Sequence, residues 1–436
     1  MPVVLCVWLA SAGATPALAG PPGTLAGLQS DLSTQLQLAG SRSSAYVYDI
    51  TAKQALFSER ATAQRAPASV EKLYTATTAL ERMGPTARLA TTVLGSGHLA
   101  AGGVWEGSLY LRGGGDPTFG TSSFIRSHYG GRGASVSTLV SQLVRVDGIH
   151  EITGSIEGDE SLLNNLRGEP SSGYAPDPFL EGTLSGLAFN RGASGSERGP
   201  HAPAAFAAHQ LFSALKSDGV TIKGSSGAAA TPAGATPLAQ AQSPTLAQLL
   251  GLMLPPSDNF FAETLIKVLG ARFAGAGTTA AGAALVRQAI GELLGIHPHV
   301  VDGSGLSPAD ATSTYEVADL LVALAPTATG TILRGDLAVA GRTGTLAHRM
   351  RNTGAAGRCQ GKTGTLTGVS NLAGYCQAAD GHLLAFAIFT DGIEIEAAHV
   401  FQDHMAITIA DSKITIAEEE AAAKASALIP PLKIGR

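Results

Sequence analysis

The chain has 436 residues, of which 44% are apolar and 14% charged, and its formal net charge is −5. This length is enough for two or more domains with sizeable cores. The small negative charge excludes the basic field that nucleic-acid-binding proteins need, so we expect no nucleic-acid partner. The sequence has no His-Glu-x-x-His motif and no paired Cys/His spacing, so we expect neither a metal site nor a cofactor.

Residues 1–19 predict a cleaved signal peptide. An apolar run at 3–14 precedes the small residues of 17–19, which suit a cleavage site that leaves Gly20 first. A short membrane anchor is the alternative, but the run is too short to span a bilayer, and no later segment reaches spanning length. We expect an exported protein without a transmembrane anchor, located in the periplasm, in the cell wall or outside the cell.

The predicted elements begin with two strands, at 45–49 and 54–58. A helix opens at Ser69, because the apolar residues that follow recur at helical spacing. From 89 to 239 the pattern changes to short strands, glycine clusters and turns. A stretch at 227–243 has the composition of a linker.

The C-terminal half returns to helices and then to strands. Two helices, three strands and a closing helix are predicted at 246–253, 260–273, 361–366, 371–377, 383–390 and 397–410. Strands from both chain ends can pair in one antiparallel sheet with helices packed on it, which predicts an α+β fold. The domains that we expect are a discontinuous catalytic domain, an insertion and a tail, at 24–88 and 240–414, 89–239 and 415–436.

Ser69 and Lys72 are three residues apart, so a helix places their side chains on one face. A serine hydroxyl is a weak nucleophile unless a base takes its proton, and a neutral lysine can be that base. Lysine is neutral near pH 7 only if burial or another cation, here Lys362, lowers its pKa. Ser213 and Lys216 have the same spacing, but they end a predicted helix, whose carbonyls stabilise a protonated lysine. We therefore interpret the second pair as structural.

Ser257 and Asn259 lie on a predicted loop just before a helix. A hydroxyl beside the lysine can relay a proton to a leaving amine, and an amide can hold a substrate carbonyl. Capping of the helix by Ser257 or Asp258 is the structural alternative, and the two roles are compatible.

Four residues at the start of a predicted strand, Lys362, Thr363, Gly364 and Thr365, form the third candidate motif. A strand edge can pair with an extended peptide, while the lysine and the threonine hydroxyls bind its terminal carboxylate. The last N–H group can complete an oxyanion hole with that of the nucleophile. A near-copy at 341–346 runs into a segment, 347–351, that lacks strand alternation, whereas the later copy leads into two apolar strands, so we place the site at the later copy.

Cys359 and Cys376 flank this motif, and their midpoint falls between Thr367 and Gly368, a plausible hairpin turn. Strands that reverse there place the two sulfurs within reach of a disulfide, which an oxidising compartment permits. Two unpaired buried thiols are the alternative. We predict the bridge.

Read in chain order, Ser69-Val-Glu-Lys72, Ser257-Asp-Asn259 and Lys362-Thr-Gly-Thr365 resemble the motifs of the penicillin-binding D-alanyl-D-alanine carboxypeptidase/endopeptidases. The 188-residue separation of the first two motifs is similar to the class C low-molecular-mass branch, which carries a long insertion there. Further similar stretches lie at 111–117, 154–159, 302–306 and 361–375. The resemblance covers most of the mature chain.

The resemblance implies a β-lactamase/transpeptidase-like domain, with helices packed on a five-stranded antiparallel sheet, and one or two small inserted β-rich domains. It implies that Ser69 is the acylated nucleophile and Lys72 its base, and that Ser257 assists proton transfer. The residues that it implies for binding the substrate, or the carboxylate of a β-lactam, are Asn259, Lys362, Thr363, Gly364 and Thr365.

We therefore expect a serine D-Ala-D-Ala carboxypeptidase that acts on peptidoglycan stem peptides, can cut their crosslinks and is acylated by β-lactams. Two alternatives stay open: a serine β-lactamase, and a non-catalytic wall-binding or antibiotic-sensing protein. Glu160-Ser-Leu-Leu-Asn164 matches the glutamate motif of some β-lactamases, but it precedes Ser257, so we treat it as coincidence. The intact Lys72 and Lys362 argue against a non-catalytic protein.

Overall fold

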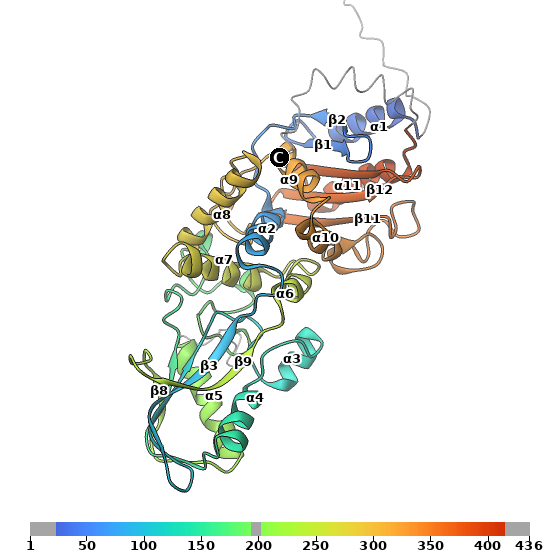
Figure 1. The fold of residues 1–436 in the computed structure, drawn as a ribbon. Helices are drawn as coiled ribbons and strands as arrows, with labels where there is room; N and C mark the ends of the chain where they lie inside the picture. Colours follow the sequence, from blue (N-terminus) through green and yellow to red (C-terminus); the bar gives the residue numbers. More distant parts are fainter. Residues whose placement is uncertain (1–22, 193–201, 415–436) are drawn as a thin grey trace, which may run out of the picture.

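The computed structural model describes residues 23–192 and 202–414. The predicted signal peptide, 1–19, and the predicted tail, 415–436, lie outside the described residues. Figure 1 shows one body built on a sheet of strands from both chain ends and a second body built on a sheet from the middle of the chain. Helices α6 (Leu246–Met253) and α7 (Asn259–Phe273) lie between these bodies.

The first sheet has six antiparallel strands in the order β10-β11-β12-β13-β1-β2. Their bounds are Ser44–Asp49 (β1), Gln54–Glu59 (β2), Ala338–Val339 (β10), Cys359–Leu366 (β11), Val369–Gln377 (β12) and Leu383–Asp391 (β13). Because β13 pairs with β1, both chain ends share one sheet, which confirms the α+β prediction. The expected five strands are the long ones; β10, with two residues, is too short to produce a sequence pattern.

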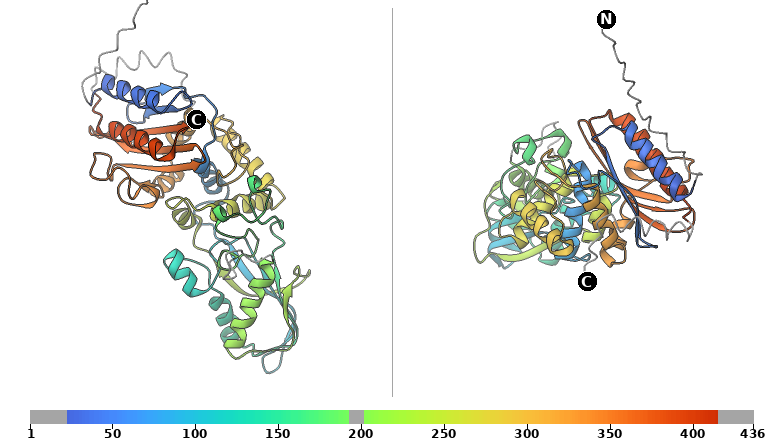
Figure 2. Two further views of the ribbon diagram at one scale, coloured as in Figure 1. Left: turned by 180° about the vertical axis from the view of Figure 1, so that it is seen from behind. Right: turned by 90° about the horizontal axis from the view of Figure 1, so that it is seen from above.

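Helices cover both faces of this sheet. On one face, α1 (Leu25–Leu38) and α11 (Ile395–Asp411) lie side by side, as Figure 2 shows, and their apolar residues close a core against the strands. A larger core on the other face includes α6, α7 and four further helices, α2 (Lys72–Met83), α8 (Thr279–Leu294), α9 (Thr314–Leu324) and α10 (Ala328–Gly335).

The second sheet has seven strands and is formed by the middle of the chain. Its strands are Ala90–Ala100 (β3), Val104–Arg112 (β4), Glu151–Ile152 (β5), Ile156–Asp159 (β6), Thr221–Ile222 (β7), Ser226–Ala228 (β8) and Thr236–Gln242 (β9). Helices that belong to this body are α3 (Ser122–Tyr129), α4 (Val136–Ser141) and α5 (Pro203–Ser217). Only α5 was expected, so this body is more helical than the sequence pattern predicts.

The linker predicted at 227–243 is wrong, because most of its second half is strand β9. This strand pairs antiparallel with β3, about 150 residues earlier, with Ala241 opposite Thr91. Its inward residues are only alanines, Ala239 and Ala241, so the alternation of burial leaves little trace in the hydropathy of the sequence.

Strands β11 and β12 form the predicted hairpin. The turn lies at Thr367 and Gly368, and the glycine has a φ of 71°, which favours a residue without a side chain. Cys359 stands opposite Cys376, and a disulfide joins them. The strand that carries the third motif is therefore fastened covalently to its neighbour.

Within residues 23–192 and 202–414, no single helix is long and apolar enough to cross a membrane. The bent pair α9 and α10, at 115° to each other, passes the same test of length and composition. Nor does the described part of the chain contain a group of three or more His, Cys, Asp or Glu side chains that could hold a metal ion.

Candidate active site

Ser69 lies in a 3-10 turn, Ala68–Glu71, and α2 begins only at Lys72. The prediction that the helix opens at Ser69 was therefore three residues early. Residues i and i+3 also lie above one another in a 3-10 turn. The Lys72 Nζ is accordingly 2.9 Å from the Ser69 Oγ, and the first motif is assembled.

The turn before Ser69 is held by the hairpin that carries the third motif. The Asn371 side-chain amide donates to the carbonyls of Ala66 and Pro67, both at 2.9 Å. Asn371 is paired with Gly364, and a Cβ at Gly364 would lie 2.5 Å from the Pro67 oxygen. Only glycine lets β11 lie this close to the nucleophile turn.

Lys72 is fully buried, and its amine lies against three oxygens. Besides the Ser69 hydroxyl, these are the Asn259 Oδ1 at 2.6 Å and the Ser304 carbonyl at 2.7 Å. Burial lowers the pKa of Lys72 to about 8, although nearby carboxylates, Asp302 first among them, act in the opposite direction. A lysine with such a pKa is partly neutral near pH 7 and can accept the serine proton.

The second motif meets the third at Ser257. The Lys362 Nζ donates to the Ser257 Oγ and to the Thr363 carbonyl, both at 2.8 Å. Ser257 has a φ of 67°, which is unusual for a residue with a side chain and indicates a loop held by its surroundings. Burial and the charge of Lys72 lower the pKa of Lys362 well below its usual value. Lys362 therefore lies near Lys72, but burial, and not Lys362, is the first cause of the lowered pKa of Lys72.

The near-copy segment 341–346 is not the third motif, but it lies against it. The Thr363 hydroxyl donates to the Thr345 hydroxyl at 2.8 Å, and the Thr345 N–H donates to the Pro255 carbonyl at 3.0 Å. The segment thereby connects β11 to the loop that carries Ser257. Thr365, near the end of β11, is exposed, so a substrate can reach it.

The middle body of the chain also reaches this site. While the Asn259 Oδ1 accepts from Lys72, the NH₂ group of the same amide donates to the Phe179 carbonyl at 2.8 Å. Between Ser257 and Asn259, the Asp258 carboxylate receives two hydrogen bonds from Arg191, at 2.6 and 3.0 Å. The second motif is therefore held in place by hydrogen bonds from the middle of the chain, at Phe179 and Arg191.

The two rejected candidates have structural roles. Ser213 and Lys216 are exposed near the end of α5, and Lys216 lies over the Phe212 ring at 5.4 Å. Glu160 pairs with Arg167 through two contacts of 2.7 Å, so its carboxylate is occupied.

Three residues at the site were missed: Ser304, Glu263 and Asp302. The stretch 302–306 was noted as part of the resemblance but was given no role. Glu263 accepts hydrogen bonds from the N–H groups of Gly303 and Ser304, both at 2.8 Å. The available signal was its position four residues after Asn259, which places both side chains on one helix face.

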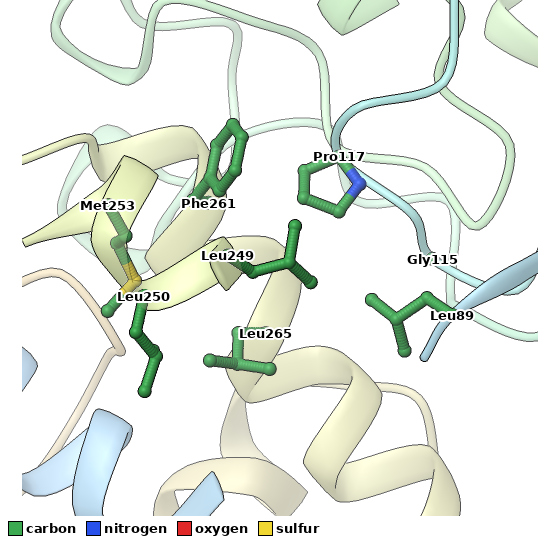
Figure 3. Close-up of a pocket in the computed structure, with 8 residues that line it drawn as sticks. All are labelled: Leu89, Gly115, Pro117, Leu249, Leu250, Met253, Phe261 and Leu265. Carbon is green, nitrogen blue, oxygen red and sulfur yellow. The ribbon is translucent and has the colours of Figure 1, made fainter. Parts of the chain in front are cut away.

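Figure 3 shows a separate pocket between α6, α7 and two segments next to the second sheet, Leu89 just before β3 and 115–117 after β4. Leucine, methionine and phenylalanine side chains of the two helices face Leu89 and Pro117 across it. No titratable group is among these lining residues, so this pocket cannot supply acid–base chemistry.

A family model matches residues 26–176 and 186–412: the D-Ala-D-Ala carboxypeptidase 3 (S13) family. A D-alanyl-D-alanine carboxypeptidase of Actinomadura sp. (strain R39) is 31% identical, over 92% of this chain and 87% of that protein. Among solved structures, penicillin binding protein 4 from Haemophilus influenzae superposes with a TM-score of 0.72 at 19% identity, over 86% of this chain and 97% of that one. The same protein complexed with a β-lactam gives a TM-score of 0.68 at 19% identity and the same coverage. The folds are alike, which supports the predicted transpeptidase-like architecture.

Proposed function

We infer the function of this chain from its family, because the chain belongs to the D-Ala-D-Ala carboxypeptidase 3 (S13) family. Its activity is that of a serine D-Ala-D-Ala carboxypeptidase, a peptide hydrolase. We propose that its substrates are the stem peptides of peptidoglycan, that the same site cuts peptide crosslinks, and that the protein is exported to reach them.

For the acylation step we propose Ser69 as the nucleophile and Lys72 as its base. The neutral amine takes the hydroxyl proton while the Ser69 Oγ bonds to the carbonyl carbon of the penultimate D-Ala. The bond to the terminal D-Ala then breaks. The amine of the terminal D-Ala leaves with a proton that is relayed to it through the Ser257 hydroxyl. This hydroxyl lies on the Lys362 side of the site. Water hydrolyses the acyl-enzyme, and Ser69 recovers its proton.

Substrate binding follows from the charge and exposure of β11. The terminal carboxylate of the peptide accepts hydrogen bonds from the Thr363 and Thr365 hydroxyls, beside the buried Lys362 amine. The Thr365 N–H and the Ser69 N–H stabilise the oxyanion, and Gly364 leaves room for the two to converge. A β-lactam presents a carboxylate and a reactive amide in the same order, so it acylates Ser69. The complex of the Haemophilus influenzae relative with a β-lactam supports this proposal.

One observation carries the mechanism: the Lys72 amine is fully buried, 2.9 Å from the Ser69 hydroxyl. The test is release of D-Ala from a synthetic pentapeptide, followed together with covalent labelling by a fluorescent penicillin. We expect both in the wild type and neither in Ser69→Ala. Undiminished labelling of Ser69→Ala would exclude this nucleophile. Rapid turnover of the penicillin, without D-Ala release, would identify a β-lactamase instead.

A further inference from the structure

We propose that Glu263 is a positioning residue for the general base. Its carboxyl group holds the loop that contains Ser304, and the Ser304 carbonyl accepts a hydrogen bond from the Lys72 amine. This inference rests on the proposed function of Ser69 and Lys72.

Helix α7 positions the Lys72 amine in two ways, once by a direct contact and once through the loop that contains Ser304. Asn259 and Glu263 are four residues apart on one face of the helix. Asn259 contacts the Lys72 Nζ directly, at 2.6 Å. Glu263 Oε1 instead accepts from the Gly303 and Ser304 N–H groups, and the Ser304 carbonyl then lies 2.7 Å from the same amine.

The loop has further anchors: Asp302 within the turn, and the Thr75 hydroxyl of α2, which donates to the Gly303 carbonyl at 3.1 Å. Asp302 accepts from the N–H groups of Ser304, Gly305 and Ser307, at 3.1, 2.6 and 2.7 Å. These bonds shape the turn internally, whereas Glu263 ties it to the helix that carries Asn259. If Glu263 is lost, the turn keeps its shape and its bond to Thr75 of α2 but loses its hydrogen bonds to α7, the helix that carries Asn259.

Three buried carboxyl groups act on the charge of the base, Glu263 from α7, Glu71 beside Lys72 itself and Asp302 from the loop, and a fourth, Asp310, lies against Asp302. All four are buried, and burial raises the pKa of each. For Glu263 the pKa rises to about 8, first through burial and then through Asp302. Its Oε2 has no hydrogen-bond partner among the described residues. Glu263 is therefore largely protonated near pH 7, and Asp258 and Lys362 are the other charged groups facing the site.

These properties predict different results for two substitutions. Glutamine keeps the oxygen that accepts from Gly303 and Ser304 and resembles a protonated carboxyl, so Glu263→Gln should acylate within about fivefold of wild type. Leucine leaves the buried Gly303 N–H without an acceptor, leaves the Ser304 N–H only its longer bond to Asp302, and removes the hydrogen bonds between the loop and α7. Glu263→Leu should slow acylation by about 100-fold.

The pH profile separates positioning of the base from general support of the fold. As the pH rises, Glu263 is ionised in a growing fraction of the molecules, and its negative charge raises the pKa of Lys72. Glu263→Gln removes that charge and should move the acid limb of the acylation rate to lower pH, by about half a unit. The matched control is Thr264→Val: Thr264 is the next residue on α7, is buried, and has a hydroxyl without a partner among the described residues. It should keep the wild-type rate and profile.

The measurement is the second-order rate constant for acylation by a fluorescent penicillin, from pH 6 to 10, for the full chain and the three variants. A slow Glu263→Leu together with a shifted Glu263→Gln supports the proposal. An unshifted Glu263→Gln overturns it even if Glu263→Leu fails to fold, and so does a Glu263→Leu as fast as wild type. Wild-type protein that takes no label would instead contradict the proposed function.

A second, independent observation concerns a hollow about 20 Å from Asn259, the distance that thirteen helical residues cover. The geometry points to a binding site for an oxyanion, phosphate or carboxylate. Three exposed arginines line the hollow: Arg88 before β3, which also donates to the Ser243 carbonyl at 2.6 Å, Arg112 at the end of β4 and Arg272 at the end of α7. The hydroxyl residues Thr92 and Ser161 also line it, and none of the described lining residues is acidic.

The cations of this hollow lack counter-charges. Neither Arg112 nor Arg272 forms an ion pair with a residue in the described part of the chain, and burial lowers the pKa of Arg272 with no carboxylate to oppose it. Like charges on one concave surface repel one another. The chain has more acidic than basic residues, with a net charge of −5, yet none of the described residues that line this hollow is acidic. Guanidinium groups bind phosphate and carboxylate in the same forked geometry.

The test is titration of the full chain with polyphosphate and with poly-glutamate at low salt, which separates the two anion chemistries. The double variant Arg112→Glu/Arg272→Glu should lose at least about tenfold in affinity for the preferred anion. The control Arg126→Glu/Arg145→Glu makes the same change of net charge at exposed arginines elsewhere and should bind as wild type. Equal losses in both double variants, or no binding of either anion by wild type, would overturn the inference.

Discussion

Removal of Arg191 should slow acylation, although this side chain is outside the serine–lysine cluster. Arg191 donates two hydrogen bonds to Asp258, and both side chains are only 11% exposed. Burial alone would lower the pKa of Arg191, but Asp258 raises it above its usual range, which shows how strongly the two charges attract. The pair joins the middle body of the chain to the residue between Ser257 and Asn259.

The size of the effect follows from what Arg191→Ala leaves behind. Breaking a fully buried pair costs about 3–5 kcal/mol, because one charge stays buried without its partner. Asp258 keeps some solvent contact and still caps α7 through the Phe261 N–H at 3.0 Å, so we expect about 2 kcal/mol. If the same free energy is lost in the transition state for acylation, because the loop no longer holds Ser257 and Asn259 in place, acylation slows by about 10- to 30-fold.

The assay is the rate of labelling by a fluorescent penicillin, with thermal unfolding measured in parallel. Arg167→Ala is the matched control, because it breaks the two-contact pair with Glu160 away from the site. We expect a lower melting temperature in both variants but slower labelling only in Arg191→Ala. Labelling of Arg191→Ala at the wild-type rate, or equal slowing in both variants, would refute the reasoning.

Three further predictions follow from single features. Because the pKa of Lys72 is about 8 and its neutral form is the proposed base, acylation should increase with pH through about 8; a flat rate from pH 6 to 9 would contradict this role. Replacing Cys359 and Cys376 by alanine should lower the free energy of unfolding by about 3 kcal/mol in urea titrations, and no change would show that the bridge does not stabilise the chain. Gly364→Ala places a Cβ against the Pro67 carbonyl and should slow labelling by at least about tenfold; unchanged labelling would show that the turn can move freely.

The sequence predicted the parts of the fold and site that local pattern controls. The strands β12 and β13 are nearly continuous buried runs that are mostly apolar, and the hairpin between β11 and β12 could be located from Cys359 and Cys376. The spacing of Ser69 and Lys72 predicted their contact even though the 3-10 turn replaces the expected helix start, because both geometries bring i and i+3 together.

The remainder depends on contacts between distant segments. Strand β9 was read as a linker because it is a strand only through its pairing with β3. The contacts of Phe179 and Arg191 with the second motif join residues 80 and 67 positions apart, and neither residue has a local pattern that predicts its partner. The carbonyl of Ser304 is a backbone group, which no residue type identifies.

The account depends above all on acylation of Ser69, and intact mass after penicillin treatment tests it most directly. We expect one adduct with the mass of the intact penicillin, and peptide mapping should place it on the peptide that contains Ser69. No adduct, or an adduct on a peptide without Ser69, would contradict the account.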